Sequence, residues 1–397
     1  MSNGRKLLAL LPIVAIAVAS CNVPLEKPAA EAPKPRIVVH NSLDDALHEI
    51  DALPLNVVSG GFRGPLSDTL DRLTNTRVVL VGETHNRYEH HLVQLAILRA
   101  VHRKQPAMAI GVEWFQQDVQ PHLDDYIAGT ISEAQMLHRT EYYLRWRFDY
   151  RHYRPIMEYA RTHRIPVLAL NAPVALTRQI GRNGIESLSK EARDRLPATL
   201  DRSNPSYVKR IREAYEAHSE SEQLFDNFLT VQLVWDETMA RNTVRYLKRH
   251  PGHRMVVLAG TGHTGFRSAI PDRIVRRLPV STVTIVTENE PPSAAPEAGF
   301  ADVVVVGPAL ELTPSGKLGV LINTEQRRVL ITKVLEESGA FKSGIRAGDQ
   351  ITKLEGRNIH SFSDLKLALI HQRPGDTVSV EVKSANEPAR DLRVVLQ

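Results

Sequence analysis

Two short motifs of the same form, a glycine followed three residues later by a histidine, occur in this chain of 397 residues. The first runs from Gly82 to His85 and the second from Gly260 to His263. Each follows a short apolar run rich in valine, which is typical of a buried strand. Glycine at the end of a strand lets the backbone turn sharply and approach a ligand closely. We therefore expect both histidines to face one site.

Other polar side chains follow neighbouring predicted strands or lie near their ends. They are Glu83, Arg87, His90, His91, Glu113 and Asn171. In open α/β sheets, ligands bind at the carboxyl ends of the strands. The alternative is that these residues only cap helices and satisfy buried amides. Convergence of four strand ends favours a binding site.

The elements that must position these residues alternate between strands and helices. The predicted strands span 77–81, 107–112, 166–170, 255–259, 283–286 and 301–306, and the first predicted helix spans 88–103. This alternation predicts an α/β fold with a mainly parallel sheet flanked by helices. Residues 187–249 have helical composition and no strand signal, which predicts a helical insertion over one edge of the sheet.

At this point a family resemblance becomes visible. The segments GETHNRYEHH (82–91), GVEWF (111–115) and AGTGHTGF (259–266) together resemble the ChaN-like haem-binding lipoproteins of the Tiki/TraB superfamily. Trp146, the Asn171-Ala-Pro segment and the segment beginning at Asp236 also match, over about residues 60–308. The resemblance implies haem binding in iron uptake, or a metal-dependent hydrolase, with Asp236 in a supporting role. The resemblance also leaves open whether two copies of the chain form a homodimer.

The residues can serve either chemistry. Haem iron needs an axial imidazole or phenolate, an apolar wall and cations for its propionates. His85, His90, His91, His263 and Tyr153 are the candidate ligands, and the stretch 141–154 mixes aromatic residues with four arginines. In a hydrolase, His85 and His263 would bind a divalent metal such as Mn, Co or Zn with Glu83 or Glu113, and a free carboxylate would be the general base. Haem binding is the leading interpretation, and no local metal-ligand motif such as His-Glu-x-x-His is present.

The N-terminus has the pattern of an exported lipoprotein. Arg5 and Lys6 precede a thirteen-residue run, 7–19, that is apolar apart from Pro12, and the small residues before Cys21 resemble a lipobox. Cys21 is the only cysteine, so the chain can form no internal disulfide. We expect diacylglycerol and an N-acyl chain such as palmitate on Cys21. Asn22 favours the outer membrane, with the protein facing the periplasm or the cell surface.

Composition indicates a soluble globular body and argues against a nucleic-acid partner. The formal net charge is +5, and loss of Arg5 and Lys6 with the leader leaves +3. No basic block interleaved with aromatic residues occurs.

The last ninety residues resemble a PDZ domain. A glycine loop at 315–319 enters an apolar strand, and a strand at 328–334, a helix at 362–371 and a final strand at 377–383 are predicted. Leu367 and Ile370 of this helix are candidates for lining the pocket that takes a peptide side chain, with the register of the helix left open. By this resemblance, the backbone amides of Leu318, Gly319 and Val320 would bind the C-terminal carboxylate of a peptide or envelope protein. The alternative is a PDZ fold that serves only as an internal brace. The predicted divisions are residues 1–20 (signal peptide), 21–36 (tether), 37–308 (ChaN-like domain) and 309–397 (PDZ domain).

Overall fold

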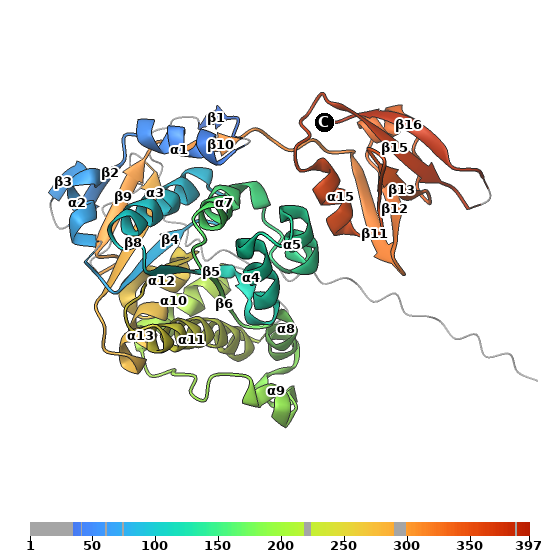
Figure 1. The fold of residues 1–397 in the computed structure, drawn as a ribbon. Helices are drawn as coiled ribbons and strands as arrows, with labels where there is room; N and C mark the ends of the chain where they lie inside the picture. The colour runs from blue at the N-terminus through green and yellow to red at the C-terminus, as the bar shows by residue number, and fades with distance from the viewer. Residues whose placement is uncertain are drawn as a thin grey trace, which may run out of the picture.

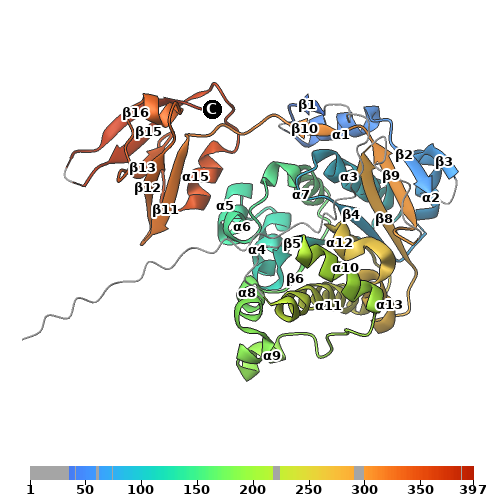
Figure 2. The ribbon, with the colours of Figure 1, turned by 180° about the vertical axis from the view of Figure 1, so that it is seen from behind.

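The computed structural model describes residues 35–397, apart from 41, 60–61, 74, 218–223, 290–298 and 386. The predicted leader, Cys21 and nearly all of the predicted tether lie outside these residues. Within the described part of the chain, no helix combines the length and the hydropathy needed to cross a membrane. Figures 1 and 2 show a larger body of helices around a sheet and a smaller, β-rich body at the C-terminal end.

An eight-stranded sheet forms the centre of the larger body. Its strand order is β3-β2-β9-β8-β4-β7-β5-β6. The strands are β2 (Asn56–Ser59), β3 (Phe62–Pro65), β4 (Val78–Glu83), β5 (Met108–Gln116), β6 (Val167–Asn171), β7 (Arg254–Gly260), β8 (Thr282–Asn289) and β9 (Val303–Gly307). The strands from β9 to β6 pair in parallel, whereas β2 is antiparallel to both of its neighbours. The prediction of an α/β fold with a mainly parallel sheet is confirmed.

Helices cover both faces of this sheet, which explains the unbroken apolar runs of its central strands. Val79 and Val81 of β4 belong to the same core cluster as α3 (Tyr88–Lys104) and α7 (Arg154–Thr162). Val78 and Leu80 point the other way, because successive side chains of a strand alternate between its faces. They pack with α11 (Phe225–Arg249) and α13 (Ile270–Arg277).

The helical insertion lies differently from the prediction. Residues 187–249 contain α9 (Lys190–Asp194), α10 (Pro205–Glu216) and α11, and the described residues among them form no strand. Met239, Ala240 and Val244 of α11 pack against residues of β4, β5 and β7. The insertion therefore covers a face of the sheet rather than one edge, because α11 has 25 residues and spans several strands.

The smaller body is an antiparallel sheet with a helix beside it, as predicted for a PDZ domain. The strands β11 (Val320–Glu325), β12 (Arg328–Val334), β13 (Gln350–Leu354), β15 (Thr377–Lys383) and β16 (Arg390–Val395) neighbour one another in that order, and β14 (Arg357–Asn358) pairs with β13. The helices are α14 (Gly339–Lys342) and α15 (Phe362–Leu369). The prediction that 377–383 is the last strand was wrong: β16 follows it, with charged residues that interrupt its apolar pattern.

Helix α15 packs on two helices of the larger body, α5 (Glu133–Arg139) and α6 (Tyr142–Arg145). Lys366 Nζ lies 5.7 Å from the ring centroid of Tyr143. We expected Leu367 and Ile370 to line a peptide pocket, but both pack against the core of the larger body. The helix turns Leu365 and Leu369 toward the PDZ core instead.

Candidate functional site

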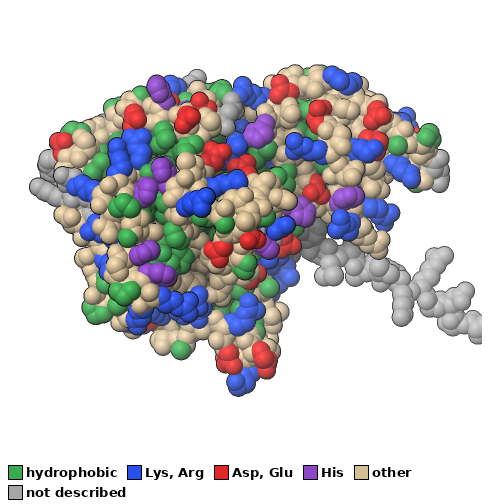
Figure 3. Space-filling view, viewed as in Figure 1, with side chains coloured by type: hydrophobic (Ala, Val, Ile, Leu, Met, Phe, Trp, Pro, Cys, Tyr) green, Lys and Arg blue, Asp and Glu red, His purple; other side chains and the backbone are tan. Residues whose placement is uncertain are grey.

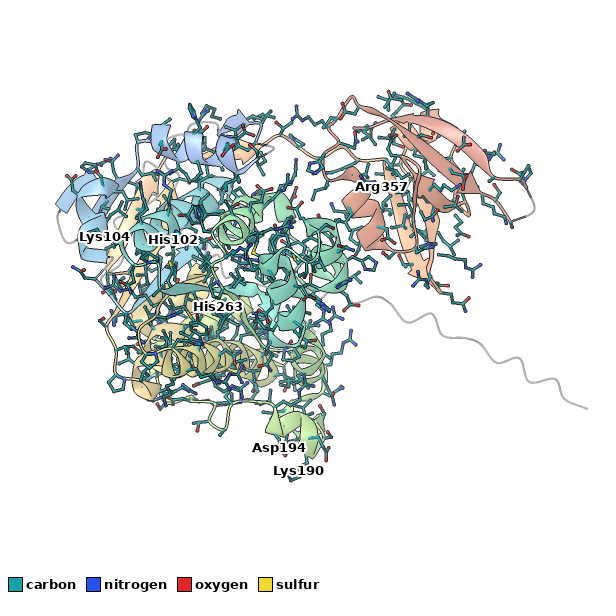
Figure 4. The ribbon with its side chains drawn as sticks, viewed as in Figure 1. His102, Lys104, Lys190, Asp194, His263 and Arg357 are labelled. Atoms are coloured by element: carbon teal, nitrogen blue, oxygen red, sulfur yellow. The ribbon has the colours of Figure 1, made fainter. Side chains whose placement is uncertain are left out.

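A pocket opens at the carboxyl ends of β4, β5, β6 and β7, as the sequence predicts for this fold. It encloses about 60 Å³ of solvent-accessible space, enough for a few waters or a small ion. Its walls include Glu83, His85, Glu113, Trp146, Asn171, Trp235, Gly260 and His263. All four predicted strand ends therefore contribute to one site. Figure 4 labels His263 within the larger body, well away from Arg357 of the PDZ domain.

The two Gly-x-x-His motifs pack against each other, and this contact explains their glycines. A Cβ on Gly82 would lie 2.4 Å from Thr264 Oγ1, and one on Gly260 would lie 2.9 Å from His85 Cε1. The glycine of each motif thus makes room for a side chain of the other motif. Glu83 and Gly260 are also direct neighbours in the pairing of β4 with β7.

Glu83, His85 and Glu113 form a compact, buried cluster at the base of the pocket. Each offers one ligand atom, and these atoms lie within 4.8 Å of one another. His85 Nδ1 donates to Glu83 Oε1 at 2.5 Å, and the Gly260 amide donates to Glu113 Oε2 at 2.7 Å. The other oxygen, Glu83 Oε2, is buried and accepts no hydrogen bond among the described residues. A bulge in β5 between Val112 and Gln116 places Glu113 where it can turn into the pocket.

The charges of this cluster support one another. Burial would lower the pKa of His85, but the Glu83 carboxylate outweighs burial and raises it. Burial would likewise raise the pKa of Glu83, yet the imidazole of His85 holds it below its usual value. The pair therefore favours a charged carboxylate beside a cation.

His263 lies between two carboxylates. Its Nδ1 is 2.6 Å from Asp236 Oδ1, and its Nε2 is 3.4 Å from Glu113 Oε1. Burial alone would lower the pKa of His263, but Glu113 and Asp236 outweigh it and raise the pKa to about 9. Tyr207 of α10 donates to Asp236 Oδ2 at 2.7 Å. Sequence reasoning missed Tyr207, because it lies on the helical insertion and no local motif marks it.

A second group missed from the sequence fixes the helix that carries Asp236. The next residue, Glu237, is fully buried and pairs with three arginines of α13, Arg273, Arg276 and Arg277. Arg273 also lies over the ring of Tyr207, 4.6 Å from its centroid. This network ties α11 to α13 and α10 behind the pocket.

Several predicted ligands lie behind the pocket rather than in it. His90 Nδ1 accepts from the Thr84 amide at 3.0 Å, and His91 Nε2 donates to the His85 carbonyl at 3.2 Å. The Tyr153 hydroxyl donates to the same carbonyl at 3.3 Å, and burial holds its pKa well above the ordinary value. These side chains support the backbone around His85. Arg87 lies at the start of α3 outside the pocket wall.

Asn171, by contrast, lines the pocket. It donates to the Glu113 carbonyl at 3.1 Å and accepts from the Ala172 amide at 2.8 Å. It thereby holds the backbone of Glu113 in place.

The space around His85 suits an ion better than a porphyrin. Trp146 and Phe148 both pack on its ring, and the centroid of each of their rings lies 4.8 Å from the centroid of the His85 ring. Its Nε2 would lie only 3.4 Å from a Cβ on Gly260, and the residue is 5% exposed. A haem ring needs an open plane in front of its axial ligand, and His85 lacks one.

The predicted peptide site of the smaller body has a suitable loop. Gly319 has a φ of +81°, and a Cβ there would lie 2.2 Å from that of Ser338. In the described part of the chain, the amides of Leu318 and Gly319 donate to no protein acceptor. Among the residues that the structure describes, strand β11, which begins at Val320, pairs only with β12, and its other edge is free. A free edge beside unpaired amides is the geometry that an added peptide strand requires.

A family model of known proteins matches each of the two bodies. A family model for the domain described as haem-binding uptake, Tiki superfamily, ChaN matches residues 69–274, more than half of the chain. The chain belongs to this family. A PDZ domain model matches residues 316–394.

Solved and curated relatives agree with these matches. A structure described as cofacial haem binding to ChaN of Campylobacter jejuni is 17% identical, with a TM-score of 0.51 over 64% of this chain and 96% of that one. This likeness shows that the larger body has the ChaN fold. The chloroplastic protein RETICULATA-RELATED 5 of Arabidopsis thaliana is 23% identical over 54% of this chain and 31% of its own length. The periplasmic pH-dependent serine endoprotease DegQ of Escherichia coli is 35% identical over 16% of this chain and 14% of its own. The chain thus spans less than a third of each of these two curated relatives.

Proposed function

We propose that this ChaN-family chain is a metal-dependent hydrolase of the bacterial cell envelope, with a PDZ domain that binds the C-terminus of a peptide or protein substrate. The observation that carries the proposal is the buried cluster of Glu83, His85 and Glu113, in which Glu83 Oε2 lacks a hydrogen bond. A buried carboxylate oxygen without a donor is costly unless a cation binds it. The sequence alone placed haem first, and the closeness of these three side chains reverses that order.

The charge balance of the site supports a divalent cation. Glu83, Glu113 and Asp236 bring three negative charges into a buried region, and protonated His263 returns one positive charge. His85 adds none, because an imidazole that binds a metal gives up the proton on the binding nitrogen. A divalent cation on Glu83, His85 and Glu113 would neutralise the remaining two. Nitrogen and carboxylate ligands of this kind suit Mn, Co or Zn.

Each residue then has a role. Glu83, His85 and Glu113 would hold the metal, which supplies Lewis acidity toward the substrate and water. Asp236 orients His263 through Nδ1, so His263 can keep a proton on Nε2 facing the pocket. Glu113 lies 3.4 Å from that nitrogen, which lets it stabilise the imidazolium. Trp146 and Trp235 form the apolar walls against which a substrate packs.

The envelope location rests on the sequence. The leader and the lipobox before Cys21 support export and lipid attachment at the outer membrane. Mass spectrometry of the mature N-terminus should find an acylated Cys21. A mature chain that begins elsewhere without lipid would refute this part of the proposal.

Haem binding is the second candidate, and family membership favours it. Trp146 and Trp235 would supply apolar contacts for a porphyrin, and His85 and His263 would be the candidate iron ligands. A second copy of the chain could cover the exposed face of such a ring. This candidate would place the protein in iron uptake.

One assay separates the two candidates. The purified chain should cleave N-acyl peptides with an apolar C-terminal residue when Mn²⁺, Co²⁺ or Zn²⁺ is added, and His85→Ala should lose at least about a hundredfold in rate. The Lys248→Gln variant, changed at an exposed position on α11, should cleave like the parent. A strong Soret band with haemin and no turnover with any metal would replace the hydrolase proposal with the haem candidate.

A further inference from the structure

Three exposed arginines near the pocket have no acidic partner within the described residues. They are Arg147, Arg178 and Arg182, and none takes part in an ion pair or hydrogen bond there. Many other surface arginines of this chain are paired, and the face shown in Figure 3 intersperses basic and acidic side chains. Other arginines, such as Arg103 and Arg357, are also unpaired among the described residues, so the feature that sets these three apart is their position beside the pocket.

Helix α8 (Val174–Asn183) directs two of these arginines to the pocket side. Val174 and Thr177 line the pocket at the start of the helix. Residues four apart share one face of a helix, so Arg178 lies on the face of Val174, and Arg182 continues that face away from the pocket. Together they form a basic stripe that leads out from the pocket wall.

Arg147 lies beside a residue of the pocket wall that comes from a different segment. It directly follows Trp146, which lines the pocket and packs on His85. Its φ of +72° lies in the left-handed region, which is costly for a residue with a side chain. Neighbouring Arg145 also lines the pocket, but Asp118 and Glu141 already pair with it.

The arginines are close enough to repel one another. Burial lowers the pKa of Arg178, and the charges of Arg147, Arg182 and Arg145 lower it further. An anion held between Arg147 and Arg178 would relieve this repulsion. The planar guanidinium group binds a carboxylate through two parallel hydrogen bonds, which makes arginine well suited to this role.

We propose that Arg147 and Arg178, with Arg182 behind them, bind a carboxylate group of a ligand whose remaining part enters the pocket. The inference rests on the proposed function in so far as the pocket holds a substrate. Two ligands would bring such a group: a peptide fragment with a free carboxylate, or a porphyrin with its propionates. The shared chemistry is a carboxylate about one helical turn from an aromatic wall.

Matched probes test this proposal on the full chain. N-benzoylglycine is compared with its amide, and haemin with its dimethyl ester, by quenching of tryptophan fluorescence. In at least one pair, the parent should bind the free acid about tenfold more tightly than the blocked form. The pair that shows the preference identifies the source of the carboxylate. In Arg147→Gln/Arg178→Gln the preference should disappear, whereas the equally charged control Lys248→Gln/Arg249→Gln should keep it.

The same proteins are titrated with Mn²⁺. This second measurement distinguishes a failure of the carboxylate site from a failure of the proposed metal-dependent function. Equal affinities within both pairs, no binding of any probe, or a preference that survives Arg147→Gln/Arg178→Gln would overturn the carboxylate site. A parent that prefers the free acid but binds no Mn²⁺ would support the carboxylate site and overturn the metal-dependent function.

Discussion

His263 Nδ1 and Asp236 Oδ1 lie 2.6 Å apart, although Asp236 belongs to α11 and His263, 27 residues later in the chain, to the short helix α12 (Thr261–Thr264). The contact fixes which ring nitrogen of His263 faces the pocket, because a carboxylate accepts only from a protonated nitrogen. It also links His263 to Tyr207 through the second oxygen of Asp236. A neutral amide at position 236 would keep the shape and remove this charge.

Asp236→Asn should therefore lower the rate of metal-dependent hydrolysis by about ten- to a hundredfold, the usual effect of losing a partner that orients a site histidine. Metal affinity should change less than the rate, since Asp236 does not belong to the metal cluster. Rates and Mn²⁺ titrations of this variant and of Tyr207→Phe, which keeps the carboxylate, provide the check. Unchanged turnover in Asp236→Asn would show that His263 plays no part in the reaction.

Gly260→Ala should damage the site without changing any polar group. Its new Cβ would lie 2.9 Å from His85 Cε1, so the His85 ring of the cluster would have to move, whereas Glu113 Oε2, at 3.6 Å, would remain in ordinary contact. We expect at least a tenfold loss of Mn²⁺ affinity, read by calorimetry. Gly252→Ala is the matched control, because its Cβ would meet nothing within 4 Å. Equal Mn²⁺ affinity in the two variants would argue against a metal site at His85.

The histidine motifs were predictable because their signal is local. Gly82, His85, Gly260 and His263 each follow an apolar run, and a parallel sheet brings such strand ends together. Glu113 was found for the same reason, although it lies within β5 rather than after it. No local pattern marks Tyr207, because its role depends on how α10 packs against α11.

The same limit explains the misplaced ligands. His90 and His91 follow the first motif closely in sequence, but they lie on α3, which turns them into the core behind His85. Helix α15 was also predicted from the sequence. The direction in which Leu367 and Ile370 point was not predictable, because it depends on how the helix packs against the larger body. Packing between distant elements decides such orientations.

Peptide binding by the PDZ domain should depend on a free C-terminal carboxylate. In the full chain, amidating an apolar C-terminal peptide should weaken binding at least about tenfold, since the unpaired amides near Gly319 would lose the charge they face. Gly319→Ala should have a similar effect, because its Cβ would overlap Ser338. Gly344→Ala has a similar φ, +83°, without any neighbour within 4 Å, and should retain binding. Affinity that is indifferent to amidation would leave the domain as a brace.

The stability that the Asp149–Arg151 ion pair adds should be lost in acid. Burial would raise the pKa of Asp149, but the Arg151 guanidinium outweighs it and lowers the pKa to about 2. Ser315, near the PDZ domain, donates to the same carboxylate at 3.2 Å. A folded-state pKa below the ordinary 3.8 means that the stabilisation is complete above pH 4 and is lost as the pH falls through about 2. The difference in melting temperature between the parent and Asp149→Asn should shrink over that window, and a difference that stays constant from pH 5 to pH 2 would exclude this role.

The most direct test of the central claim is an anomalous-difference map of crystals of the chain soaked in Mn²⁺, recorded on both sides of the manganese edge. We expect one strong peak between Glu83, His85 and Glu113, and we expect this peak to be absent from Glu83→Gln crystals of the same form. A map without a peak at this cluster, or with an equal peak in the Glu83→Gln crystals, would contradict the assignment of these three residues as a metal site.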